Sequence, residues 1–172
     1  GKTCGIFGLG AIGFAFAKMA QGFGMRVISY SRHKKTDSKY DFIEQVDFDT
    51  FLKESDVISI HAPLTPSTEN TFDTEAFAKM KDGVILINTA RGGLIVEEAL
   101  ADALRSGKVY GAGLDVLRDE PPKKDNPLFH LNNTSITAHI AWLTRASRLR
   151  AIDIAIENFK AYLNGTPTSV IN

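Results

Sequence analysis

Three polar residues in the second half of the chain have the types needed for proton transfer beside an anionic substrate: Arg91, Glu120 and His139. A planar guanidinium binds a carboxylate well, an imidazole can give and take a proton, and a nearby carboxylate stabilises the imidazolium and orients its ring. Hydride transfer to a 2-oxo acid needs such groups around the developing alkoxide. Each residue also has an ordinary alternative: a surface salt bridge for Arg91, a solvated loop charge for Glu120, and a hydrogen-bonded histidine near a helix start for His139.

The elements that must position these residues are strands alternating with helices, which predicts an α/β chain with a doubly wound, Rossmann-like parallel sheet. Arg91, Glu120 and His139 follow the last three expected strands, and ligands of open α/β sheets bind at the carboxyl ends of strands. We therefore expect the three side chains along one edge of the sheet. The expected strands are residues 3–7, 25–30, 57–61, 84–88, 109–114 and 134–137.

Two crossover helices are expected, at residues 12–23 and 96–106, the second with Leu100 and Leu104 on one face. A longer helix is expected at residues 142–163, and its apolar face needs a partner surface. That face comprises Leu149, Ile152, Ile156, Phe159 and Leu163.

A glycine-rich turn directly follows the first expected strand, at Gly8-Leu9-Gly10-Ala11-Ile12-Gly13. In a dinucleotide-binding fold the first glycine permits a tight turn, the second lets the backbone approach the pyrophosphate, and the third lets helix and strand pack closely. Free N–H groups at the helix start then face the phosphates. The alternative is a glycine-rich turn with no ligand.

Composition excludes several classes of function. The chain has 172 residues, 44% of them hydrophobic, which suits one globular domain with a real core. Lys plus Arg equals Asp plus Glu at 20 each, so no net positive field exists to attract nucleic acid or an anionic membrane. The single cysteine, Cys4, is expected to be a small buried hydrophobe. We predict no metal site and no membrane segment, and expect a cytoplasmic protein.

The segment about 20 residues beyond the glycines is expected to select the cofactor, because NAD enzymes place a carboxylate there for the ribose 2′-OH. This chain has Ser31-Arg32-His33-Lys34-Lys35 instead. Without a carboxylate, and with cations at hand, NADP is favoured over NAD, with Arg32 as the main contact. The alternative is a basic, solvated loop that tolerates either cofactor.

Motifs along the whole chain resemble those of the NAD(P)-binding domain of the D-isomer-specific 2-hydroxyacid dehydrogenase family. Besides the glycine motif, they lie at residues 23–25, 61–65, 80–83, 88–93, 111–116, 120–121 and 139–141. The resemblance implies that Arg91 binds the substrate carboxylate and carbonyl, that His139 is the acid/base, and that Glu120 pairs with His139. It also implies that Asp115 contacts the nicotinamide carboxamide.

The complete set of expected cofactor-binding residues combines the glycine turn, the basic segment and the strand-end positions implied by the resemblance. It comprises Gly8, Gly10, Ala11, Ile12, Gly13, Ser31, Arg32, His33, His61, Ala62, Pro63, Thr89, Ala90, Arg91, Asp115, His139 and Ala141.

The chain differs from the family pattern in one residue before His139 and in its domain content. Ala138 stands where the family usually has proline, which removes a conformational restraint before His139. Residues 1–141 are expected to form the dinucleotide-binding domain. Residues 142–172 resemble the segment that returns to a substrate domain, and most of that domain is expected to be absent from this chain.

The resemblance implies a homodimer and a small 2-oxo or 2-hydroxy acid substrate. Trp142 resembles sequences of the glycerate dehydrogenase and hydroxypyruvate reductase branch, where the substrate is hydroxypyruvate or glyoxylate; its alternative role is a packing anchor. The competing function is a dinucleotide-sensing binding module, similar to the corepressors related to this family, without significant turnover.

Overall fold

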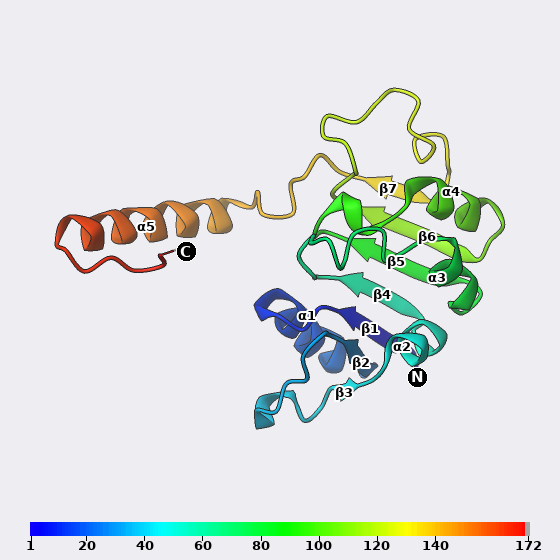
Figure 1. Cartoon of the computed structure of the whole chain (residues 1–172), viewed down its shortest axis with the longest axis horizontal. Helices are drawn as coiled ribbons and strands as arrows, with labels where there is room; N and C mark the ends of the chain where they lie inside the picture. Colours follow the sequence, from blue (N-terminus) through cyan, green and yellow to red (C-terminus); the bar gives the residue numbers. More distant parts are fainter. Residues whose placement is uncertain (171–172) are drawn as a thin grey trace. The chain divides into compact units, whose positions relative to one another are not determined.

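A parallel β-sheet is the centre of unit 1 of the chain, residues 1–138, in the computed structural model, which describes residues 1–170 (Figure 1). Its seven strands lie in the order β3-β2-β1-β4-β5-β6-β7, and every neighbouring pair is parallel. The chain winds outward from β1 in both directions, which is the doubly wound arrangement expected from the alternating pattern. The strands are β1 (Thr3–Phe7), β2 (Arg26–Tyr30), β3 (Glu44–Gln45), β4 (Val57–Ile60), β5 (Val84–Asn88), β6 (Val109–Leu114) and β7 (Thr134–Ile136).

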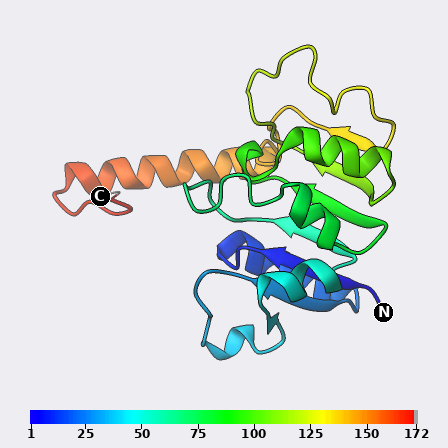
Figure 2. The same cartoon turned by 45° about the vertical axis from the view of Figure 1, so that its right-hand side comes forward.

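Helices cover both faces of this sheet (Figure 2). Alternate strand side chains face opposite sides, so Ile6 packs in the cluster that includes α1, whereas Phe7 packs in the larger cluster beneath the other helices. Because β1 is covered on both faces, all five of its residues are buried, and the four from Cys4 to Phe7 form a continuous apolar run. The helices of unit 1 are α1 (Ala11–Gly22), α2 (Phe48–Glu54), α3 (Thr74–Lys79) and α4 (Glu97–Arg105), with short 3₁₀ turns η1 (Ser38–Tyr40) and η2 (Gly92–Leu94).

Sequence and structure agree well on the long elements and less well on the short ones. Leu100 and Leu104 of α4 are buried, as expected. Cys4 is also buried, as expected, and this burial raises the pKa of its thiol to about 11. The edge strand β3 was not predicted, because its two residues are polar and form no apolar run. The short helices α2 and α3 are defined mainly by their caps, in which the carboxylates of Asp47 and Asp73 accept N–H bonds of 2.9 Å.

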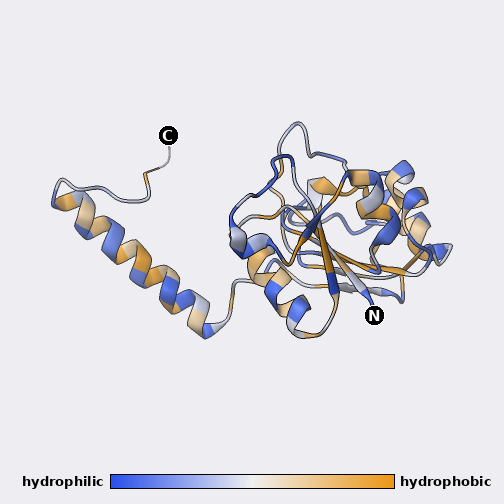
Figure 3. Cartoon of the chain, turned by 90° about the horizontal axis from the view of Figure 1, so that it is seen from below, coloured by the Kyte–Doolittle hydropathy of each residue, from blue (hydrophilic) through white to orange (hydrophobic). Residues whose placement is uncertain are grey.

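Unit 2 begins at His139, whereas the sequence motifs place the end of the dinucleotide-binding domain at residue 141. It contains the long helix α5 (Arg145–Leu163), which starts three residues later than expected because Thr144 caps it, its hydroxyl accepting the Ser147 N–H. Apolar residues recur along α5 (Figure 3), and the expected apolar face is exposed. Within residues 1–170, no helix has both the length and the apolarity needed to cross a membrane.

Candidate functional site

The glycine turn between β1 and α1 has the steric properties expected for a phosphate-binding loop. Gly8 has φ of 95°, and a Cβ there would lie 2.6 Å from the Ala62 backbone nitrogen. A Cβ at Gly13 would lie 2.3 Å from the Gly8 carbonyl oxygen, so α1 can pack this closely only with glycine. A Cβ at Gly10, by contrast, would meet nothing within 4 Å. The turn is therefore tight on its protein side and open on the side from which a phosphate would approach.

The end of β2 is fastened to this turn by two hydrogen bonds. The Gly8 N–H donates to the Tyr30 carbonyl at 2.9 Å, and the Leu9 N–H donates to the Ser31 hydroxyl at 2.7 Å. Ser31 thus occupies the start of the segment in which NAD enzymes place a carboxylate. Because its oxygen accepts from Leu9, its hydroxyl proton can be donated elsewhere.

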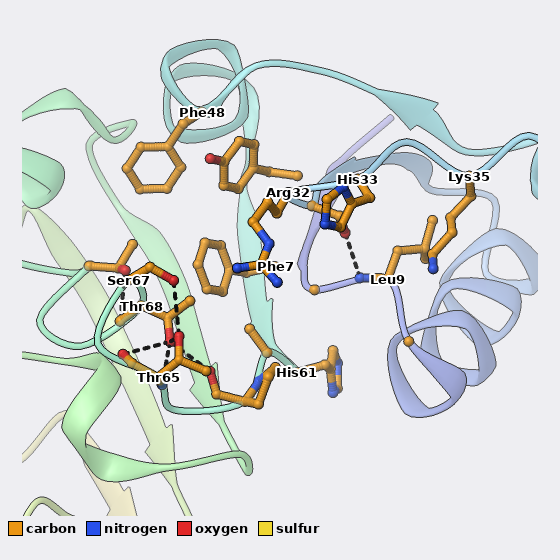
Figure 4. Close-up of a pocket in the computed structure, with 17 residues that line it drawn as sticks. Phe7, Leu9, Arg32, His33, Lys35, Phe48, His61, Thr65, Ser67 and Thr68 are labelled. Atoms are coloured by element: carbon orange, nitrogen blue, oxygen red, sulfur yellow. Dashed lines mark hydrogen bonds between the residues drawn. The ribbon is translucent and has the colours of Figure 1, made fainter.

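A cavity of about 520 Å³ opens beside the glycine turn, at the carboxyl ends of β1, β2 and β4. Figure 4 shows the Arg32 guanidinium directed into it, close to the Phe7 ring. Eight of the expected cofactor-binding residues line it: Gly8, Gly10, Ser31, Arg32, His33, His61, Ala62 and Pro63.

The other expected residues of unit 1 do not line this cavity. Ala11, Ile12 and Gly13 form the first turn of α1, where helix geometry leaves backbone N–H groups without an intrahelical acceptor. Four more lie in the loops after β5 and β6: Thr89, Ala90, Arg91 and Asp115. His139 and Ala141 belong to unit 2.

Sequence reasoning missed two groups of cavity residues. Phe7, Tyr30 and Phe48 form an aromatic wall, with ring centroids 5.8 Å apart for Phe7 and Tyr30 and 5.1 Å apart for Tyr30 and Phe48. A second wall carries hydroxyl groups, from Thr65, Ser67, Thr68 and Thr71. The run of Thr and Ser residues after Pro63 could have predicted the second wall. No sequence pattern near Phe48, which lies in α2, indicates that it lines a cavity.

The hydroxyl wall is internally hydrogen-bonded. The Thr68 hydroxyl donates to the Pro63 carbonyl at 2.7 Å and accepts the Thr65 N–H at 2.8 Å. The Thr65 hydroxyl lies 3.0 Å from the hydroxyls of Ser67 and Thr68. These bonds hold the segment after β4 in a fixed turn beside the cavity (Figure 4).

His61 is a cavity residue suited to a neutral role. Its Nε2 lies 2.9 Å from the Ser59 hydroxyl, and its ring centroid lies 5.4 Å from that of Phe16. Burial lowers the pKa of His61 below its ordinary value of 6.5, because the charged imidazolium is poorly solvated there. A neutral imidazole at this position suits the sequence expectation that His61 is a cofactor-binding residue.

Arg91 lies in the turn after β5, and its exposed guanidinium donates to the Ala90 carbonyl at 2.6 Å. Its backbone is extended, with φ of −148° and ψ of 137°. The next residue, Gly92, packs so closely on the following loop that a Cβ would lie 1.9 Å from the Leu117 carbonyl carbon. The turn that carries Arg91 is therefore pressed against the loop that carries Glu120.

The loop after β6 is joined to its neighbours on both sides. The buried Asp115 donates its N–H to the Asn88 carbonyl at 2.9 Å, and its carboxylate accepts the Thr137 hydroxyl at 2.5 Å. Glu120 is exposed, and its carboxylate accepts the Leu117 N–H at 3.3 Å. The structure thus brings Arg91, Asp115 and Glu120 into adjoining loops at one edge of the sheet.

His139 begins unit 2 and has φ of 55°, in the left-handed region that few residues other than glycine adopt. Its carbonyl accepts the Trp142 indole N–H at 3.2 Å, which is a local packing contact for that tryptophan. The pairing of His139 with Glu120 stays a prediction. Among the described residues, no cluster of His, Cys, Asp and Glu could hold a metal ion.

Comparison with known proteins adds a family match. A family model described as "D-isomer specific 2-hydroxyacid dehydrogenase, NAD binding domain" matches residues 1–141. A hydroxypyruvate reductase from Blautia hydrogenotrophica is 49% identical over 172 residues, which are 100% of this chain and 53% of that protein. The chain therefore spans about half the length of this relative.

Solved structures are also similar. A glyoxylate reductase from Paecilomyes thermophila superposes with a TM-score of 0.87 at 39% identity, covering 94% of this chain and 49% of that one. An acyclic imino acid reductase in complex with NADPH and D-Arg superposes with a TM-score of 0.91 at 38% identity, covering 99% of this chain and 54% of that one.

Proposed function

The chain belongs to the D-isomer-specific 2-hydroxyacid dehydrogenase family as its NAD-binding domain, and we propose that it serves an enzyme that interconverts a small 2-oxo acid and its D-2-hydroxy acid. Hydroxypyruvate and glyoxylate are the proposed substrates, supported by the names of the similar reductases. The observation that carries the proposal is the match of residues 1–141 to that family. It is supported by the glycine turn after β1 and by Arg91 and Glu120 in the loops after β5 and β6, all at the carboxyl ends of strands of one sheet.

The cavity residues fit a dinucleotide. Gly10 leaves open space beside the first turn of α1, and that turn offers N–H groups to a pyrophosphate. When bound, the nicotinamide supplies or accepts the hydride. The chain's own part is to bind the substrate carboxylate through Arg91 and to pass a proton at the alkoxide oxygen through His139. The charge of Glu120 would stabilise the imidazolium of His139 in the reducing direction.

NADP(H) is the proposed preferred cofactor, because Arg32, His33 and Lys35 line the cavity where a carboxylate would otherwise stand. Arg32→Ala should weaken NADPH binding selectively, and calorimetry with NADPH and NADH on the full-length protein measures this. Lys34→Ala is the matched control, since Lys34 is an exposed neighbouring cation that does not line the cavity. Equal loss for both cofactors would remove Arg32 from the 2′-phosphate site.

The acid/base pair is tested by its pH dependence in the full-length enzyme. His139→Ala should reduce turnover in both directions with cofactor affinity nearly unchanged. Glu120→Gln removes the charge that supports the imidazolium, so 2-oxo acid reduction should lose activity at lower pH than in the parent. Hydroxy acid oxidation, which needs the neutral imidazole, should persist to lower pH. Unchanged profiles in both directions, with chemistry rate-limiting, would refute the pairing.

The competing function, a dinucleotide sensor without turnover, is not favoured, because the similar proteins are reductases. Reduction of hydroxypyruvate or glyoxylate by the full-length protein distinguishes the two. The 172-residue chain alone should turn over little, because both walls of a cleft are needed to orient the substrate. A homodimer and a cytoplasmic location complete the proposal; sedimentation as a clean monomer at high concentration would contradict the former.

A further inference from the structure

Asn88, the last residue of β5, is a fully buried polar side chain whose hydrogen bonds all serve one turn. Its exposed fraction is 0%. Its amide nitrogen donates to the Arg91 carbonyl at 2.9 Å, and its amide oxygen accepts the Ala90 N–H at 3.0 Å. A buried amide is costly unless it is hydrogen-bonded, and here both of its polar atoms are used on the residues that present Arg91.

The backbone carbonyl of Asn88 adds a second connection. It accepts the Asp115 N–H at 2.9 Å, which ties the end of β5 to the loop after β6. On the far side of Arg91, Gly92 is pressed against the Leu117 backbone. The main chain of Arg91 is therefore fixed on one side by an asparagine amide and on the other by a close backbone contact, while its side chain stays exposed.

We infer that Asn88 is a positioning residue for Arg91, holding its backbone so that the guanidinium meets the substrate carboxylate in one orientation. The inference rests on the proposed function, in which Arg91 binds that carboxylate. Ala90 and Arg91, which the Asn88 side chain bonds, are among the expected cofactor-binding residues, but like Asn88 they lie outside the cofactor cavity, so the effect of Asn88 should fall mainly on the 2-oxo acid. A misplaced cation weakens both substrate binding and transition-state stabilisation, because orientation is a large part of the catalytic effect.

Two substitutions separate the amide's two bonds. Asn88→Ala removes both, whereas Asn88→Asp keeps an acceptor for the Ala90 N–H and places an oxygen against the Arg91 carbonyl in place of the donor. Asn133→Ala is the matched control, since the Asn133 amide also bridges backbone carbonyls, those of Leu104 and Tyr110, both at 3.2 Å. It lies just before β7, at the opposite end of the strands.

The experiment measures KM and kcat for hydroxypyruvate, together with NADH and NADPH affinity, in the full-length enzyme. Asn88→Ala should raise KM and lower kcat/KM on the order of tenfold, with cofactor affinity changed less than about twofold. Asn88→Asp, which sets an oxygen against the Arg91 carbonyl in place of a donor, should lower kcat/KM at least as much as Asn88→Ala, and Asn133→Ala should leave KM unchanged. If Asn88→Ala does not fold, Asn88→Asp alone carries the same expectation of raised KM with retained cofactor affinity.

Coupling to Arg91 is the decisive measurement. In an Arg91→Ala background, adding Asn88→Asp should reduce kcat/KM less than about twofold, because the guanidinium that Asn88 is proposed to position is already absent. A full additional loss there, or a parallel loss of cofactor affinity, would overturn the positioning role. If the parent lacks 2-oxo acid turnover, or Arg91→Ala leaves KM unchanged, the proposed function itself fails, and the inference with it.

Discussion

The two ends of the same sheet edge are built differently. Around β1, β2 and β4 the edge is hollow, with open space at Gly10 and a cavity lined by cations, hydroxyls and aromatic rings. Around β5 and β6 the loops are braced against each other, through Asn88 to Arg91 and Asp115, and through Gly92 to Leu117.

The difference follows from what each end is proposed to bind. A dinucleotide is large and brings its own shape and charge, so the protein must chiefly leave room and offer N–H groups and cations. A small 2-oxo acid has few atoms to hold, so the groups that meet it must be fixed beforehand. Substitutions that fill the hollow end or loosen the braced end should therefore fail in different ways.

Gly92→Ala should give the largest effect, because its Cβ would lie 1.9 Å from the Leu117 carbonyl carbon, within the braced loops. We expect the free energy of unfolding to fall by about 3 kcal/mol, with loss of turnover. Denaturant titration of the full-length protein measures the change. Gly22→Ala is the control, since a Cβ there meets nothing within 4 Å. A loss at Gly92 no larger than at Gly22 would show that the loops are not interlocked.

Gly10→Ala should separate binding from stability at the hollow end. Its Cβ would meet no protein atom within 4 Å, so stability should stay within about 0.5 kcal/mol of the parent. The methyl group would stand where the pyrophosphate approaches, and cofactor affinity should fall by about tenfold or more. Unchanged affinity by calorimetry would place the pyrophosphate elsewhere.

Ser31→Ala should have a smaller, mixed effect. It removes the acceptor for the Leu9 N–H, which should cost about 1 kcal/mol and loosen the glycine turn. Affinity for NADPH and NADH should then fall together, in contrast to the selective loss expected for Arg32→Ala. If Ser31→Ala weakens NADPH alone, the hydroxyl acts on the 2′-phosphate and not on the turn.

His61 should give the smallest effect, visible only in the pH dependence of stability. Burial lowers its pKa below 6.5, so the unfolded chain binds the proton more readily than the folded one. The stability due to neutral His61 is present above pH 6.5 and is lost as pH falls through the lowered pKa of the folded state. In His61→Asn, the free energy of unfolding should fall less steeply between about pH 7 and pH 5 than in the parent.

The sequence by itself determined the alternating α/β organisation, the order of the long elements and the glycine turn. These features are local: apolar runs, helical spacing and turn residues act over a few neighbouring positions. The same locality explains why β3, α2 and α3 were not identified individually. They are short, and their stability comes from packing and from single caps such as Asp47 and Asp73.

Only the tertiary structure decided which strand ends share the cavity and which brace each other. Strand order brings β2 and β4 to either side of β1, so Arg32, Phe48 and Thr65 line one space although no local pattern connects them. The same holds for Gly92 against Leu117. Asn88 was visible in the sequence as part of a motif, but its role depends on burial and on two bonds to the turn after it. Contacts between segments that are distant in the chain depend on how the helices and strands pack together. The spacing of residue types along the chain does not predict that packing.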